Sequence, residues 1–476
     1  MARKMTGLAI AIVVAASMLL GGLGAAPATA AEVDLVEENG ATTWFEGGNR
    51  TFLRFGQDAW FGVVWGTEEH PNFVYLVAIK ARYLGLADVY ENGRHLTDDQ
   101  PVRMKVYTVY AVKLEHLIEF NDTSGDSIAN YQRVYVGDRY NDSYVEAEPL
   151  LKRVSLRTAW TQSEVTRSQE GATRRWDFSL TATDLPYVTF PRGGNASGAL
   201  DEVTFTFHLA ATTDHVDDAS VPHFRLDIDR RVGSRNVSFS RDGNVTWSGD
   251  RLRYEAKWDQ RFVGWDFDPA NTAPGLLLEM HTFAAFRVPL DGPDWMDRLL
   301  VSRLHEGGNV RLRDEFGERT ADETDGNYAQ PRRLASPSLR FGGEWSYIGD
   351  LTWVSNATAD GVTQPVFAQI QGVVRASVVK DDAAYVGLVA LVGMSFPSGY
   401  TVEHDPLFAS DAFLPLDPTG TPRVGLWLVL ALVLGVVVVV AAVAASKRKP
   451  PATPIQQAFR QEQSREEDWS QYYNHR

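Results

Sequence analysis

One uninterrupted apolar segment near the C-terminus limits what this chain can fold into. Residues 424–445 contain no charged side chain and consist mainly of Val, Leu and Ala. These 22 residues reach about 33 Å as a helix, enough to cross a hydrocarbon core of about 30 Å. A helix is required because a single strand would leave its backbone groups unpaired in lipid. We therefore predict a transmembrane helix at 424–445; a buried core helix is the alternative.

The flanks of this segment and the start of the chain indicate its orientation. Three basic residues at 447–449 follow the segment directly, whereas only Arg423 precedes it. Basic residues gather on the cytoplasmic side, so the C-terminus is expected inside the cell. The chain begins with Arg3 and Lys4, an apolar stretch and a small-residue motif at 28–30. This is the pattern of a cleaved secretory signal, and a retained N-terminal anchor is the alternative.

Charge and cysteine content exclude several classes of protein. The chain carries a net charge of −15, and because each terminal segment carries +2, the region between them carries −19. So acidic a surface argues against nucleic acid or anionic lipid as a partner. The chain has no cysteine, which excludes disulfides, thiol catalysis and cysteine-bound metals.

Sequons for N-glycosylation are more frequent than chance predicts. Chance gives about two if Ser or Thr fills about one position in seven. The sequons lie at Asn49, Asn121, Asn141, Asn195, Asn236, Asn244 and Asn356. We therefore expect a glycosylated surface protein, and in a prokaryote this excess would favour an archaeal surface. The alternative is a Thr- and Ser-rich β protein with unused sequons.

Alternating side chains predict an all-β ectodomain. Every second residue is apolar in 176–182, 203–209, 224–228 and 252–258. This is the period of a strand with one buried face. Turn-forming residues separate such runs at 92–93, 242–244 and 248–250. Many short strands with 11% aromatic residues are typical of antiparallel β-sandwiches, and only residues 294–306 look helical.

The chain divides into six predicted segments. They are a signal peptide at 1–31, an N-terminal β domain at 32–148, a larger β-sandwich domain at 149–413, a Pro-rich stalk at 414–423, the transmembrane helix at 424–445 and a cytoplasmic tail at 446–476. The boundary inside the ectodomain is placed at a polar stretch, residues 141–143. An acidic connection at 314–331 lacks apolar periodicity and is predicted to be disordered.

Familiar catalytic motifs are absent from the sequence. His305 and Glu306 lack the second histidine of a zinc-protease helix. Pro397 stands where a nucleophile elbow around Ser395 needs glycine. A glycosidase remains an alternative, because its two carboxylates come from distant parts of a chain and leave no local motif.

Residues 122–127 (DTSGDS) contain a calcium candidate. Asp122, Ser124 and Asp126 place oxygen-bearing side chains at alternate positions, as in a calcium loop. Ser127 occupies the place of the usual glycine, and no bidentate glutamate follows. An Asx turn is the alternative. No cofactor other than calcium is expected.

A second metal candidate lies among the histidines and aspartates of residues 208–229. His208 and His223 each occupy the polar face of a predicted strand beside an acidic loop. Two imidazoles with carboxylates suit zinc or another divalent ion. A solvated hairpin face is the alternative.

One stretch, SRDGNVTW, resembles the Asp box of sialidase-like propellers. Ser240, Asp242, Thr246 and Trp247 match the motif, whereas Asn244 stands in place of its glycine. The motif staples a hairpin, so the resemblance implies a tight hairpin here and assigns no family.

These observations favour a membrane-anchored surface glycoprotein with a single membrane pass. Its ectodomain is expected to bind ligands or to form part of the cell envelope rather than to catalyse a reaction. Glycans or other surface proteins are the expected partners. An anchored, extracellular carbohydrate-active hydrolase is the alternative.

Overall fold

The computed structural model describes most of one compact unit, which extends from residue 28 to residue 416. The described residues are 33–39, 49–55, 59–96, 102–129, 131–136, 139–146, 148–190, 194–231, 234–289, 311–314, 317–320, 332–334, 337–343, 346–380 and 383–415. The predicted signal, the helix at 294–306, the transmembrane segment and the tail lie outside these ranges. The elements inside them are β-strands, which confirms the all-β prediction. No helix in the described ranges has the length and hydropathy needed to cross a membrane.

A run of antiparallel neighbours forms the first of two strand layers, named here the β6 layer. In hydrogen-bonded order its strands are β1 (Val33–Asn39), β2 (Asn49–Phe55), β3 (Ala59–Trp65), β4 (Val74–Glu91), β6 (Val102–Asn121), β15 (Pro274–Pro289), β24 (Ala383–Pro397), β23 (Phe367–Lys380) and β18 (Arg332–Leu334). A hairpin joins β4 to the short strand β5 (Arg94–His95). Asn92 and Gly93 form its turn with φ of 49° and 80°, the positive values of the predicted two-residue turn.

The second layer, named the β14 layer, is built in the same antiparallel way. Its strands are β10 (Thr161–Gln162), β11 (Thr166–Glu170), β12 (Thr173–Thr189), β13 (Asn195–Arg231), β14 (Ser234–Val263), β25 (Thr401–His404), β21 (Asn356–Ala359), β22 (Val362–Pro365), β26 (Pro406–Pro415), β20 (Ser346–Trp353), β19 (Ser338–Gly343), β16 (Arg311–Asp314) and β17 (Gly317–Thr320). The β16–β17 hairpin corrects the prediction of disorder at 314–331 for residues 317–320. Cross-strand pairing with β19 holds β16 there despite its polar sequence.

Two connections join the layers into a continuous hydrogen-bonded sheet. Strand β9 (Leu150–Ser155) pairs with β6 on one side and with β12 on the other. Residues 223–228 of β13 also pair with 86–91 of β4, in parallel. A separate hairpin is formed by β7 (Tyr131–Val136) and β8 (Arg139–Glu146). Strands from both sides of the predicted boundary at 148 thus share one sheet, and the division into two units stays a prediction.

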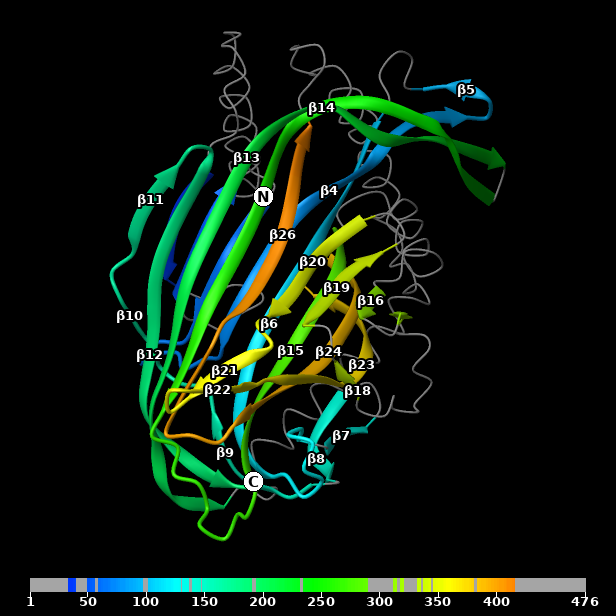
Figure 1. Cartoon of the computed structure of the whole chain (residues 1–476). Helices are drawn as coiled ribbons and strands as arrows, with labels where there is room; N and C mark the ends of the chain where they lie inside the picture. Colours follow the sequence, from blue (N-terminus) through cyan, green and yellow to red (C-terminus); the bar gives the residue numbers. More distant parts are fainter. Residues whose placement is uncertain are drawn as a thin grey trace, which may run out of the picture. The chain divides into compact units, whose positions relative to one another are not determined.

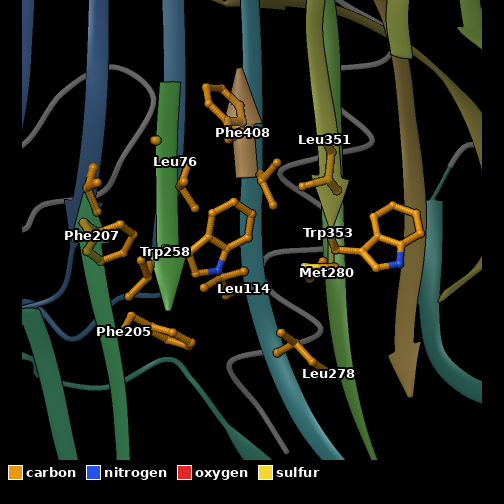
Figure 2. Close-up of a cluster of buried hydrophobic side chains, with 14 of the residues drawn as sticks. Leu76, Leu114, Phe205, Phe207, Trp258, Leu278, Met280, Leu351, Trp353 and Phe408 are labelled. Atoms are coloured by element: carbon orange, nitrogen blue, oxygen red, sulfur yellow. The ribbon is translucent and has the colours of Figure 1, made fainter. Parts of the chain in front are cut away.

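Apolar side chains of the two layers meet in one extensive core. Phe61 of β3 stacks on Tyr254 of β14 with 4.6 Å between ring centroids. Tyr110 of β6 stacks on Phe408 of β26 at 4.5 Å. Figure 2 shows part of this cluster, with the fully buried Trp258 at its centre. Burial on this scale supplies the main stabilisation, at about 25 cal/mol for each Å² of apolar surface.

The predicted alternation is confirmed in 176–182, 203–209 and 252–258. In the fourth segment, 224–228, Phe224 and Ile228 are buried but Leu226 is half-buried. The apolar residues of the other three segments are all buried: Trp176, Phe178, Leu180, Ala182, Val203, Phe205, Phe207, Leu209, Leu252, Tyr254, Ala256 and Trp258. The intervening residues are more exposed because successive side chains of a strand point to opposite faces.

Two of the predicted turns are wrong, because β13 and β14 continue past them as long paired ribbons (Figure 1). Asp242 and Gly243 together face His223, so they form a β-bulge within β14. Gly243 has φ of 84°, which suits the left-handed position of such a bulge. At 248–250, β14 stays in the ladder and the extra residue lies on β13. The hairpin implied by the Asp-box resemblance is therefore also wrong.

Candidate functional site

The candidate site lies on the side of the β6 layer that faces away from the main core. On β15, Leu278 and Met280 point into that core. Successive residues of a strand face opposite sides, so Glu279 and His281 point the other way. That side carries a smaller apolar cluster of its own, which explains how a carboxylate outside the main core is fully buried.

A β-bulge in β6 brings a second carboxylate to the same place. The register between β6 and β15 shifts at this point, and Glu115 is the extra residue. Leu114 and Leu117 both lie in the main core, although strict alternation would place them on opposite faces. The extra residue of the bulge allows both leucines to face the core and turns Glu115 and His116, which lie between them, toward the other side. Glu115 and His116 consequently approach Glu279 from neighbouring positions on one strand.

Short polar contacts connect these side chains. Nδ1 of His116 lies 3.0 Å from Oε2 of Glu279. The hydroxyl of Tyr131 donates to Oε1 of Glu279 over 3.1 Å. Nε2 of His281 lies 2.7 Å from Oε2 of Glu115. One ligand atom from each of Glu115, His116 and Glu279 lies within 4.8 Å of the others, which is compact enough for a shared ion.

Two carboxylates and a lysine ammonium group lie close together in this cluster. Glu115, His116 and Glu279 are all buried. The one lysine of the cluster, Lys113, places its Nζ 3.0 Å from Oε1 of Glu115 and 3.9 Å from the ring centroid of Phe73. Buried carboxylates in proteins are paired with cations or coordinate metals, so a bound metal ion is compatible with this cluster.

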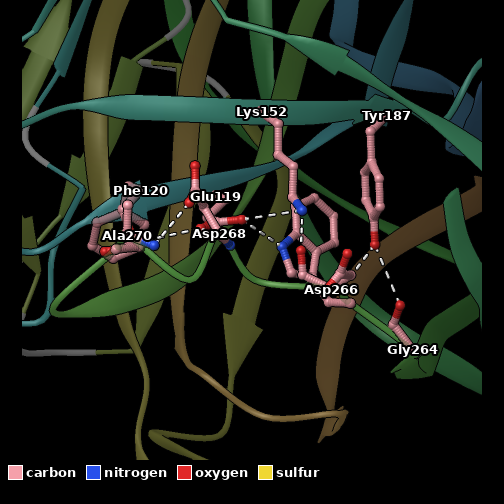
Figure 3. A network of polar contacts seen from close by, with 10 residues as sticks. Glu119, Phe120, Lys152, Tyr187, Gly264, Asp266, Asp268 and Ala270 are labelled. Carbon is pink, nitrogen blue, oxygen red and sulfur yellow. Dashed lines mark hydrogen bonds and ion pairs between the residues drawn. The ribbon is translucent and has the colours of Figure 1, made fainter. Parts of the chain in front are cut away.

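Glu119 of β6 is also a fully buried carboxylate, but its hydrogen-bond partners differ from those of Glu279 on β15 (Figure 3). Its Oε2 accepts from the indole N–H of Trp265 over 3.1 Å. Its Oε1 accepts from the backbone N–H of Asp268 and the side-chain amide of Asn271, both over 2.9 Å. Nζ of Lys152 lies 3.7 Å from Oε2. These fixed donors tie the 264–273 loop to β6, which is a structural role.

Tyr187 extends this network on the other side of the same loop (Figure 3). Its hydroxyl donates to the carbonyl of Gly264 over 3.3 Å and accepts from the N–H of Asp266 over 2.9 Å. Burial, together with nearby carboxylates, raises the pKa of Tyr187 to about 12. Lys152 lies 4.2 Å from its ring centroid, so cation and ring support each other.

The predicted calcium loop is closed by its own backbone. The carboxylate of Asp122 accepts from the N–H groups of Gly125 over 2.7 Å and Ser127 over 2.8 Å. Burial acts to raise the pKa of Asp122, but these N–H bonds outweigh it and the pKa is lowered. The hydroxyl of Ser124 donates to Asp122 over 3.2 Å. The geometry is that of the Asx turn considered as the alternative.

Three carboxylates nevertheless meet beside this loop. Oxygens of Asp122, Asp126 and the buried Glu148 lie within 4.8 Å of one another. Glu148 also accepts the N–H of Ser124 over 3.1 Å, and the sequence reading did not include it. Calcium at Asp122, Ser124 and Asp126 stays a prediction, with Glu148 as a further oxygen donor nearby.

His208 and His223 occupy distant positions of β13, and the structure does not bring them together. Nδ1 of His208 lies 2.6 Å from Asp177 and its Nε2 lies 3.1 Å from Asp259. Nε2 of His223 lies 3.4 Å from Asp88 on β4. Each histidine therefore has its own carboxylate partners, and a joint metal site at this pair has no geometric support.

His208 borders a shallow polar pocket on the β14 layer. Its volume is about 260 Å³, and its lining residues are Arg175, Asp177, His208, Leu209, Ala210 and Lys257. The pair Asp177 and His208 is half-exposed, as suits a solvated face. Both signs of charge line the pocket, which suits a polar or zwitterionic ligand.

The sequons differ in exposure where the structure describes their side chains. Asn244 and Asn356 are exposed, whereas Asn49 and Asn121 are half-buried. Oδ1 of Asn121 accepts the N–H of Ala273 over 3.2 Å. The side chains of Asn141, Asn195 and Asn236 lie outside the described part.

The sequence reading missed the cluster around Glu279. A signal was present, because Glu279 and His281 interrupt the strongly apolar stretch 276–286 two residues apart. Alternation places such a pair on one face of a strand. Comparison of the chain with protein-family models gives no match, and a search of curated proteins gives none either.

Proposed function

We propose that this chain is a single-pass surface glycoprotein whose β-sandwich ectodomain binds ligands outside the cell. In this proposal the signal at 1–31 is removed, the helix at 424–445 anchors the protein and residues 446–476 lie in the cytoplasm. The observation that carries it is the self-contained core of residues 33–415. The two layers cover each other's apolar faces, so neither terminal apolar segment is needed to complete the core.

The binding role rests on the outer face of the β14 layer. The pocket beside His208 lies on adjacent long strands and presents Arg175, Lys257 and Asp177 to solvent. A rigid sheet with polar side chains on its outer face suits recognition of hydroxyl-rich or charged surface molecules, such as glycans. Exposed sequons at Asn244 and Asn356 support the surface location.

Protease treatment of intact cells tests the topology. We expect removal of an epitope placed after residue 32 and survival of one placed after Arg476. Permeabilised cells, in which both epitopes should be digested, are the control. Loss of the C-terminal epitope from intact cells would contradict the proposal.

Mass spectrometry of the native protein tests the glycosylation. Glycans are expected first at the exposed Asn244 and Asn356. Thr246→Ala is the matched control because it destroys the sequon and keeps the asparagine. Unmodified asparagine at all seven sequons would contradict this part of the proposal.

A further inference from the structure

We propose that Glu115, His116 and Glu279 bind a divalent transition-metal ion, with zinc or manganese as the best fit. The site goes beyond the proposed surface function and does not depend on it. It stands on three independent features of the structure: the bulge, the outer contacts and the charge.

The bulge makes the ligand geometry possible. A regular strand would turn Glu115 and His116 to opposite faces, but the register shift against β15 sets them side by side. Bonds of about 2.0–2.2 Å from a metal to N and O ligands require donor atoms about 3–4 Å apart. His116 Nδ1 and Glu279 Oε2 are 3.0 Å apart, and the third donor lies within 4.8 Å of both.

Outer contacts orient the three donors, as the second shell of a metal site does. Tyr131 binds Oε1 of Glu279 and leaves Oε2 facing His116. His281 and Lys113 hold the two oxygens of Glu115. A carboxylate oxygen has two lone pairs, so a hydrogen bond to one leaves the other for a metal. Such contacts fix ligand orientation and strengthen binding.

The charge of the donors favours a cation at this place. Glu115 and Glu279 bring carboxylate oxygens from neighbouring strands within 4.8 Å of each other, and like charges at this separation repel. A divalent ion bound between them replaces that repulsion with attraction to both carboxylates.

The donor set selects the class of ion. One imidazole and two carboxylates are borderline to hard ligands and suit zinc, manganese or ferrous iron. Calcium and magnesium prefer oxygen alone, which distinguishes this site from the three carboxylates at Asp122. Three protein ligands also leave a coordination position for water or a ligand oxygen.

Calorimetric titration of the full chain tests the proposal directly. The protein is purified in detergent with a tag that lacks histidine, stripped with chelator, and titrated with Zn²⁺ and with Mn²⁺. We expect one high-affinity ion per chain. Glu279→Gln and His116→Gln should each weaken that step more than tenfold, and the conservative Tyr131→Phe should weaken it about tenfold.

His208→Gln is the matched control, because His208 also lies between carboxylates but on the other layer. It should leave the high-affinity step unchanged. The absence of a high-affinity step in the parent protein would overturn the proposal. So would a step whose affinity is unchanged in His116→Gln and in Tyr131→Phe, two variants that retain both carboxylates, or one that is lost in His208→Gln.

Discussion

Glu119 and Glu279 are two fully buried carboxylates on adjacent strands, and their surroundings differ in kind. Glu119 accepts from an indole, a backbone amide and a side-chain amide, groups that do not change charge near neutral pH. Glu279 is bound by a histidine and a tyrosine. Fixed donors make a carboxylate part of the fold, whereas a histidine beside a carboxylate can share a metal ion with it.

The comparison also separates two uses of irregular backbone. The 264–273 loop wraps around Glu119, which accepts from one backbone N–H and two side-chain N–H groups of that loop. The bulge at Glu115 has the opposite effect. As the extra residue of β6, Glu115 adds a second carboxylate beside Glu279 on the same surface. A loop that closes on a charge stabilises the fold; a bulge that gathers charges creates a potential site.

Replacing Glu119 by Gln should give the largest loss of stability. An amide offers one acceptor oxygen and turns an NH₂ group toward donors such as Trp265 Nε1, which leaves buried donors unsatisfied. We expect a loss of about 3–5 kcal/mol in the free energy of unfolding, measured by denaturant titration of tryptophan fluorescence. A loss under about 1 kcal/mol would show that Glu119 is not structural.

The same substitution at Glu279, measured in chelator, should cost less. Gln can accept from Tyr131 and donate to His116 in its other neutral tautomer, so both hydrogen bonds survive. We expect a loss of about 1 kcal/mol. A loss equal to that of Glu119→Gln would remove the distinction between the two regions.

High pH should weaken the Glu119 region through Tyr187. The pKa of Tyr187 is raised by burial from 10.0 to about 12, so its stabilising contribution is complete below pH 10 and is lost as pH rises to about 12. The slope is at most about 1.4 kcal/mol per pH unit for one group. Tyr187→Phe should flatten the denaturation profile between pH 10 and 12 relative to the parent, and identical slopes would contradict the assignment.

The smallest effect is expected at the half-exposed cluster on the β14 layer. His208→Ala removes contacts with Asp177 and Asp259, but exposed ion pairs contribute only about 0.2–1 kcal/mol. Thermal unfolding should therefore change little. A loss above about 2 kcal/mol would contradict the view that these contacts are solvent-exposed and contribute little to stability.

Much of the fold follows from the sequence, because the period of a strand is a local property. Phe205, Phe207 and Trp258 could be assigned to the core from alternation alone. The turns at 242–244 and 248–250 could not be judged in this way. Glycine and aspartate permit a reversal, but the partner strand decides whether the chain turns or bulges.

The candidate site could not be predicted from the sequence for the same reason, since it also depends on which strands pair. Glu115 and Glu279 come together only because β6 pairs with β15 in one register, with one extra residue on β6. Neither the pairing of strands so far apart in sequence nor the position of the bulge is encoded in a short motif. By contrast, the segment 208–229, which the sequence predicts to bind a divalent ion, is spread along one strand, and His208 and His223 do not meet there.

Metal-linked stabilisation in the matched pair of variants tests the central claim most directly. Unfolding of the parent chain, Glu119→Gln and Glu279→Gln is followed with chelator and with Zn²⁺ at 100 times the dissociation constant of the parent. A bound ion then stabilises the folded state by about 2.7 kcal/mol. The account predicts this gain in the parent and in Glu119→Gln, and a gain below about 1.4 kcal/mol in Glu279→Gln, whose affinity is more than tenfold weaker. An equal gain in all three proteins, or a gain in none, would contradict it.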